Sequence, residues 1–183
     1  MSTKLPRVNF LGVIAGVLAL VSILLPWWGI TASGFGSTTS SMWGFFGGPS
    51  RNPDINSASG FSSTIITYSP IILVLVLLTT ALAIAGSFTT RFRVLAGSLA
   101  TSVAALVGYA ELIGYTVSNN CQGAACITSP TGSESIVAVT LTWGFQIGFY
   151  LFITATILVV IGLVFHQTLT HRQSKADTSN AKT

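Results

Sequence analysis

Residues 70–115 read PIILVLVLLTTALAIAGSFTTRFRVLAGSLATSVAALVGYAELIGY. The stretch holds two apolar runs, 70–88 and 94–115, on either side of a short link that contains two arginines. At a helical rise of about 1.5 Å per residue, each run spans roughly 28–33 Å, close to the hydrocarbon thickness of a bilayer. Because backbone polar groups in lipid must bond to one another, both runs are predicted to be transmembrane helices that form an antiparallel hairpin.

Two further apolar runs of this kind occupy residues 10–28 and 143–165. Half of the 183 residues are hydrophobic and only 7% are charged, whereas a soluble domain usually carries about 25% charge. An ordinary soluble domain is therefore excluded. We expect an all-α membrane protein, a four-transmembrane-helix antiparallel bundle over residues 1–166, with outer loops at 29–69 and 116–142.

The basic residues lie at one end of the predicted helices. Seven of the eight precede the first helix, fill the link between the second and third, or follow the fourth: Lys4, Arg7, Arg91, Arg93, Arg172, Lys175 and Lys182. Only Arg51 lies in the long loops. The positive-inside rule predicts a multi-pass cell-membrane protein with both termini in the cytoplasm. Since these charges serve orientation, the net charge of +4 does not indicate a nucleic-acid partner.

The first run also has the basic start of a secretory signal peptide. It is longer than the usual apolar core of about 7–15 residues. Pro26, Trp27 and Trp28 stand where the outer interface would lie, a depth that indoles favour. These features favour a retained first helix over a cleaved one.

The first outer loop is dense in Ser, Thr and Gly, and short strands are an alternative there to irregular structure. Its best strand candidate is residues 65–68, Ile-Ile-Thr-Tyr. The aromatic residues Trp43, Phe45 and Phe46 are candidates for contact with the membrane interface, the helix tops or a partner. The tail at 167–183 is polar and is predicted to be a disordered cytoplasmic segment.

Residues 43–48 and residues 143–148 share the short sequence pattern W-G-F-x-x-G. The first copy lies well before its helix and the second opens one. A true repeat would place the motif equivalently in both halves, so we interpret the shared pattern as coincidence.

Cys121 and Cys126 are the only cysteines, and both lie in the second outer loop. An even count on the oxidising side of a membrane predicts a local disulfide. Four-helix thiol oxidoreductases that reduce quinone use two cysteine pairs, one of them spaced CxxC, and this chain has a single CxxxxC pair. No metal-ligand or phosphate-loop motif occurs either, so no metal, cofactor or catalytic residue is predicted.

Glu111 is the one ionisable residue inside a predicted span, which makes it a candidate functional site. Gln146 should lie at similar depth on the next, antiparallel helix. We predict that the two side chains form a polar pair by hydrogen bonding, or that Glu111 simply reaches water at the outer interface.

Small residues spaced four apart indicate close helix packing, at Gly12 and Gly16 in the inner leaflet and at Gly144 and Gly148 in the outer. The two pairs differ in depth and cannot face each other. Each pair is therefore expected to contact another part of the bundle or a second protein.

The layout resembles the claudin-like tetraspan group, with a larger first outer loop, a tight inner turn and a smaller second outer loop. Trp28 matches the tryptophan at the end of the first helix of claudins, and Ser41-Met42-Trp43 stands where their Gly-Leu-Trp belongs. The cysteines depart from that pattern, because claudins carry two in the first loop.

The resemblance, together with the lack of predicted metal, cofactor or catalytic residues, implies a non-enzymatic structural, adhesion or accessory subunit. Such a subunit would contact the lipid bilayer and other membrane proteins or a second copy of itself. Alternatives are a scaffold subunit of a respiratory or transport complex and, with less support, a quinone-linked oxidoreductase.

Overall fold

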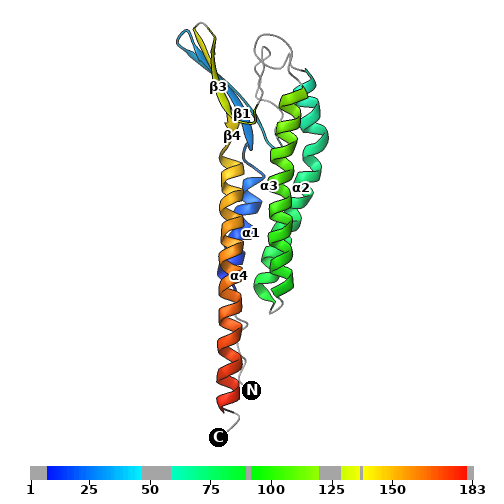
Figure 1. Ribbon diagram of the computed structural model, residues 1–183, viewed down its shortest axis with the longest axis vertical. Helices are drawn as coiled ribbons and strands as arrows, with labels where there is room; N and C mark the ends of the chain where they lie inside the picture. The colour runs from blue at the N-terminus through cyan, green and yellow to red at the C-terminus, as the bar shows by residue number, and fades with distance from the viewer. Residues whose placement is uncertain (1–7, 47–58, 90–91, 120–128, 137, 181–183) are drawn as a thin grey trace.

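The computed structural model describes residues 8–46, 59–89, 92–119, 129–136 and 138–180. In these parts of the chain the protein is mostly helical, with a small antiparallel sheet at one end of the helices (Figure 1). The prediction of a mostly helical chain is thus confirmed, while an all-α bundle is not, because a small sheet accompanies the helices.

Among the residues that the structure describes, three helices are long and apolar enough to cross a membrane: Thr64–Phe88, Phe92–Asn119 and Ile147–Phe165. They are the apolar parts of α2 (Ser59–Phe88), α3 (Phe92–Asn119) and α4 (Ile147–Asn180). α2 begins before Pro70, so residues 65–68 are helical and the strand prediction there is wrong. Proline removes one backbone donor, which membrane helices tolerate more readily than soluble ones.

The predicted hairpin of α2 and α3 is stabilised by hydroxyl groups on the facing sides of the two helices. Ser98 donates from Oγ to the carbonyl of Thr79 at 3.1 Å. The Thr79 and Thr101 hydroxyls are also bonded, at 2.8 Å. Interhelical hydrogen bonds of this kind hold membrane helices together where lipid gives no hydrophobic drive for association.

The first helix, α1, is shorter than predicted and covers Phe10–Ser22. Asn9 fixes its start: the backbone N–H donates to the Ser87 carbonyl of α2 at 2.9 Å, and Nδ2 donates to the Gly162 carbonyl of α4 at 3.0 Å. Beyond the helix, the Gly148 N–H donates to the Pro26 carbonyl at 2.9 Å. α1 therefore runs antiparallel to α4, as Figure 1 shows.

Both outer loops contribute a hairpin to one sheet. The first forms β1 (Trp28–Gly34) and β2 (Ser37–Trp43), and the second forms β3 (Gly132–Ile136) and β4 (Val139–Phe145). The strand order is β2-β1-β4-β3, all antiparallel. Strands in the first loop were an open alternative, whereas those in the second were not predicted.

The sheet changes the bounds of the fourth helix. Trp143 belongs to β4, and α4 begins at Ile147, where the Gln146 carbonyl accepts from the N–H groups of Phe149 and Tyr150. At its other end α4 continues to Asn180, so the predicted disorder of the tail is wrong for residues 167–180.

The main core lies where the base of the sheet meets the outer ends of the helices. Trp27 is fully buried, and its ring packs on Tyr109 of α3 at 5.0 Å and on Phe152 of α4 at 5.3 Å between centroids. Its indole N–H is satisfied by the Ser22 carbonyl at 2.8 Å. Ile65 and Val117 bring α2 and α3 into the same cluster.

Candidate functional site

The sheet projects from the helices, and its two hairpin tips lie farthest from the bundle (Figure 1). The two tips approach closely at Gly34, which has no side chain. A Cβ at this position would lie only 2.6 Å from the Ala138 carbonyl oxygen of the other hairpin. Burial is confined to the base: Trp28, Gly29 and Ile30 are buried, while all the described β3 side chains are exposed. The upper sheet is therefore available to another molecule.

The tip of the first hairpin carries one aromatic side chain. Phe35 is 86% exposed, and its φ of 49° lies in the left-handed region, as does the φ of 76° at Gly36. Two positive φ values match the type I′ turn that joins strands by two residues. Phenylalanine is unusual there, because a bulky side chain disfavours this conformation. The tip of the first hairpin thus carries an exposed aromatic ring on a backbone conformation that bulky residues rarely adopt.

Among the described residues, no strand pairs with the outer edge of β2. The two-residue turn makes Gly34 and Ser37 a hydrogen-bonded pair, so the alternate residues Thr38, Ser40 and Met42 direct their backbone groups outward. These groups have no partner in the part of the chain that the structure describes. β2 also lacks the charges and prolines that usually protect edge strands.

The opposite edge, β3, is shorter and carries Glu134. Short length and charge are two of the devices by which edge strands avoid pairing with other chains. The two edges thus differ, and β2 is the one suited to accept a further strand.

Of the three aromatic residues predicted for outer-loop contacts, only Phe46 is well exposed, at 67%. Trp43 is 3% exposed and packs on Trp28 with centroids 5.3 Å apart. Phe45 is half-buried and meets the Trp27 ring edge-on at 4.8 Å. Trp43 therefore takes the alternative of packing at the helix tops, and its side chain is not free for contact with a partner.

Glu111 and Gln146 do not meet. Gln146 donates from Nε2 to the Gly144 carbonyl at 3.3 Å, and its backbone N–H donates to the Trp27 carbonyl at 2.9 Å. Glu111 is exposed on the far side of α3, at a groove against α2. The predicted pair is wrong because the inward face of α3 is filled by Tyr109, Leu112 and residues in register with them.

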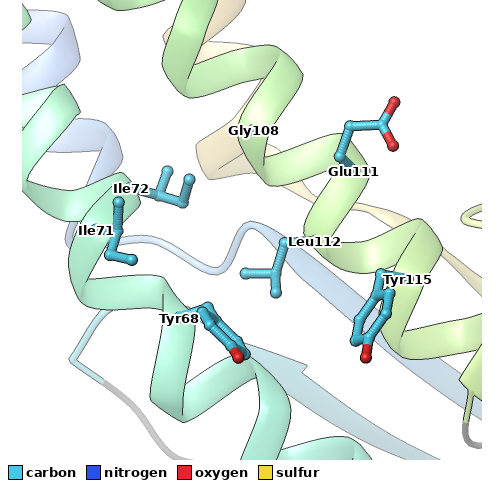
Figure 2. A pocket seen from close by; sticks show the side chains of 7 residues that line it. All are labelled: Tyr68, Ile71, Ile72, Gly108, Glu111, Leu112 and Tyr115. Carbon is cyan, nitrogen blue, oxygen red and sulfur yellow. The ribbon is translucent and has the colours of Figure 1, made fainter.

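The groove beside Glu111 has an apolar floor formed by Ile71 and Ile72 of α2 and by Gly108 and Leu112 of α3. Tyr68 and Tyr115 stand at its sheet-side end with their hydroxyls pointing the same way (Figure 2). The Glu111 carboxylate extends from the rim, away from α2 (Figure 2). A Cβ at position 108 would lie 3.0 Å from Cδ1 of Ile72, so glycine keeps the floor low.

The predicted packing glycines serve different contacts. Gly12 and Gly16 lie against α2, where a Cβ at position 12 would meet Ser87 Oγ and one at position 16 would lie 2.6 Å from Ile84 Cγ1. Gly148 lies against the chain that follows α1, with the Leu25 and Pro26 carbonyl oxygens less than 3 Å from an added Cβ. Gly144 is a strand residue in β4, so its assignment to helix packing is wrong.

The Cys121–Cys126 disulfide lies outside the described residues and stays a prediction. Within the described ranges, no group of three His, Cys, Asp or Glu side chains is placed to hold a metal ion.

Neither the protein-family models nor the curated proteins compared with this chain match it. The function must therefore be argued from the geometry alone.

Proposed function

We propose that this chain is a non-enzymatic four-span protein of the cell membrane that acts as a structural, adhesion or accessory subunit by presenting its outer sheet to other membrane proteins. Both termini lie in the cytoplasm in this proposal. The observation that carries it is the exposed half of the sheet, with the open β2 edge and the aromatic tip at Phe35.

The depth of α1 supports a fourth span. Its start is tied to Gly162 and the segment after it to Gly148, and these two residues lie within the membrane-length part of α4. Their separation along α4 corresponds to about 21 Å. The extended residues Pro26–Trp28 add length at the outer end, because a strand rises about 3.3 Å per residue. The short helix α1 and the extended residues that follow it can thus together cross the same thickness of membrane that a single longer helix would cross.

The charge distribution supports the orientation. In the sequence, seven of the eight basic residues flank the helix ends that lie opposite the sheet, and Arg51 is the exception. The positive-inside rule assigns that end to the cytoplasm. The sheet then lies outside the cell, where the predicted disulfide would persist. The claudin-like layout accords with a contact function of the outer loops, although fold analogy alone does not determine function.

The test is purification in mild detergent, with mass spectrometry of the proteins that remain bound. Phe35→Asn removes the aromatic ring and keeps a residue that tolerates the turn. Thr38→Pro removes an outward N–H of β2 without removing a bond to β1. Ser133→Pro is the matched control on the β3 edge. Loss of the same partner from the Phe35 and Thr38 variants alone supports the proposal, and unchanged binding in both contradicts it.

A further inference from the structure

The groove between α2 and α3 lies at the depth of the membrane boundary. Tyr109, adjacent to Gly108 of its floor, packs on Trp27 at 5.0 Å and on Phe149 at 6.0 Å. Those two residues mark where the first span ends and α4 begins. Glu111 and Tyr115 lie about 5 and 10 Å further out along α3. Gly108, and Ile72 beside it, are thus level with the boundary between acyl chains and headgroups, and Glu111 and Tyr115 lie on the headgroup side of that boundary.

The groove has the size and lining of a ligand site. Its volume is about 470 Å³, within the range of roughly 300–1,000 Å³ that is usual for small-molecule pockets. The apolar side chains form the floor, the Tyr68 and Tyr115 hydroxyls lie at the sheet-side end, and the Glu111 carboxylate lies at the rim. The lining therefore offers both an apolar surface and polar groups, as an amphiphile requires.

The charge of Glu111 selects among amphiphiles. The only basic side chain that the structure describes is Arg93, and it lies about 27 Å away along the same helix. No cation within the described ranges therefore neutralises Glu111. An ammonium group at the rim would complement the carboxylate, whereas a headgroup with only negative charge would be repelled.

We propose that this groove binds one lipid of the outer leaflet whose headgroup carries an ammonium group. One acyl chain lies on the floor at Ile72, Gly108 and Leu112, and the ammonium group lies against the Glu111 carboxylate at the rim. The depth argument rests on the proposed membrane placement, while the charge and shape arguments do not.

The test uses the full chain in dodecyl maltoside, with phosphatidylethanolamine and phosphatidylglycerol of identical acyl chains supplied in equal amounts. Native mass spectrometry counts the lipids that remain bound. We expect one phosphatidylethanolamine to be retained with about a two- to fivefold preference, the size expected of an exposed ion pair. Glu111→Gln should abolish the preference, whereas Glu134→Gln, which removes the same charge from the sheet, should keep it.

A second pair of variants tests the groove itself. Ile71→Trp fills the groove from an exposed position, and Val74→Trp places the same bulk at a similarly exposed site on α2 that does not line it. Only the first should lose the bound lipid. Equal retention of both lipids by the wild type would overturn the proposal. So would an Ile71→Trp variant that changes the number of protein copies in the complex and not the number of lipids, because the groove would then be a helix-docking face.

These results are separable from the contact function. A protein that binds partners through its sheet and shows no headgroup preference would keep the proposed function and lose this inference.

Discussion

Gly148→Ala is expected to disturb the junction at which α4 passes the end of the first span. The added Cβ would lie 2.5 Å from Cδ1 of Trp27, 2.8 Å from the Pro26 carbonyl oxygen and 2.9 Å from that of Leu25. Two of these neighbours are backbone atoms and the third is a ring locked in the core. None can move aside alone, so α4 must shift away from the chain it contacts.

The expected loss follows from overpacking, which typically costs about 1–3 kcal/mol. The matched control is Gly162→Ala on the same helix, where the nearest atom, Nδ2 of Asn9, would be 3.4 Å away and the other two contacts would be longer. Alanine is about 1 kcal/mol better than glycine within a helix, so the control should be neutral or slightly stabilising. The two variants should differ by about 2 kcal/mol or more.

Thermal unfolding in detergent, followed by circular dichroism, measures the difference. For a chain of this size, 1 kcal/mol corresponds to about 2–4 °C in Tm. Gly148→Ala should unfold several degrees below Gly162→Ala. Equal melting temperatures would show that α4 does not pack against Leu25–Trp27 as described, and the argument for the depth of α1 would fail with it.

Three other variants or treatments give independent outcomes. Tyr109→Phe should raise the free energy of unfolding by about 1 kcal/mol, because the buried Tyr109 hydroxyl has no hydrogen-bond partner among the described residues; a clear loss of stability would reveal a bound partner. Thr38→Pro should leave the melting temperature nearly unchanged, while Thr39→Pro, which removes an N–H bonded to β1, should lower it by several degrees; equal effects would refute the assigned strand register. Alkylation followed by intact-mass measurement should find the thiols of Cys121 and Cys126 only after reduction, and two free thiols in the native protein would remove the predicted disulfide.

The membrane-length helices were predictable because apolar runs are a local signal. The 70–88 and 94–115 runs correspond to α2 and α3, and the short link between them allowed only a hairpin. Their outer bounds were less well predicted. α2 and α3 extend beyond the predicted runs into packing with the sheet, where Ile65 and Val117 are buried, and hydropathy does not report such burial.

The sheet was not predictable from the same signal. Its central pairing joins β1 to β4, more than 100 residues apart in the sequence, and register between such distant strands leaves no local trace. The Trp-Gly-Phe pattern at 43–45 and 143–145, interpreted as coincidence, was the one useful hint. Both copies lie at the helix-side ends of the strands that flank β1.

Glu111 shows why depth alone does not define a site. Its height in the bundle followed from counting residues, but its direction depends on which face of α3 is filled by core residues. Tyr109, Leu112 and Ile113 fill that face, so Glu111 is turned outward to the groove. The predicted pair with Gln146 assumed that the Glu111 side chain lies on the side of α3 that faces α4. The spacing of polar residues in the sequence does not tell on which side of the helix it lies.

The central claim is that four segments cross the membrane and leave the sheet outside. Single cysteines at positions 2, 37, 133 and 178, in a chain lacking Cys121 and Cys126, test it with an impermeant thiol reagent on intact cells. Four crossings predict labelling at Ser37→Cys and Ser133→Cys, one in each hairpin, and protection at Ser2→Cys and Thr178→Cys until the cells are opened. Labelling of position 2 in intact cells, with position 178 still protected, would show that α1 does not cross and would contradict the account.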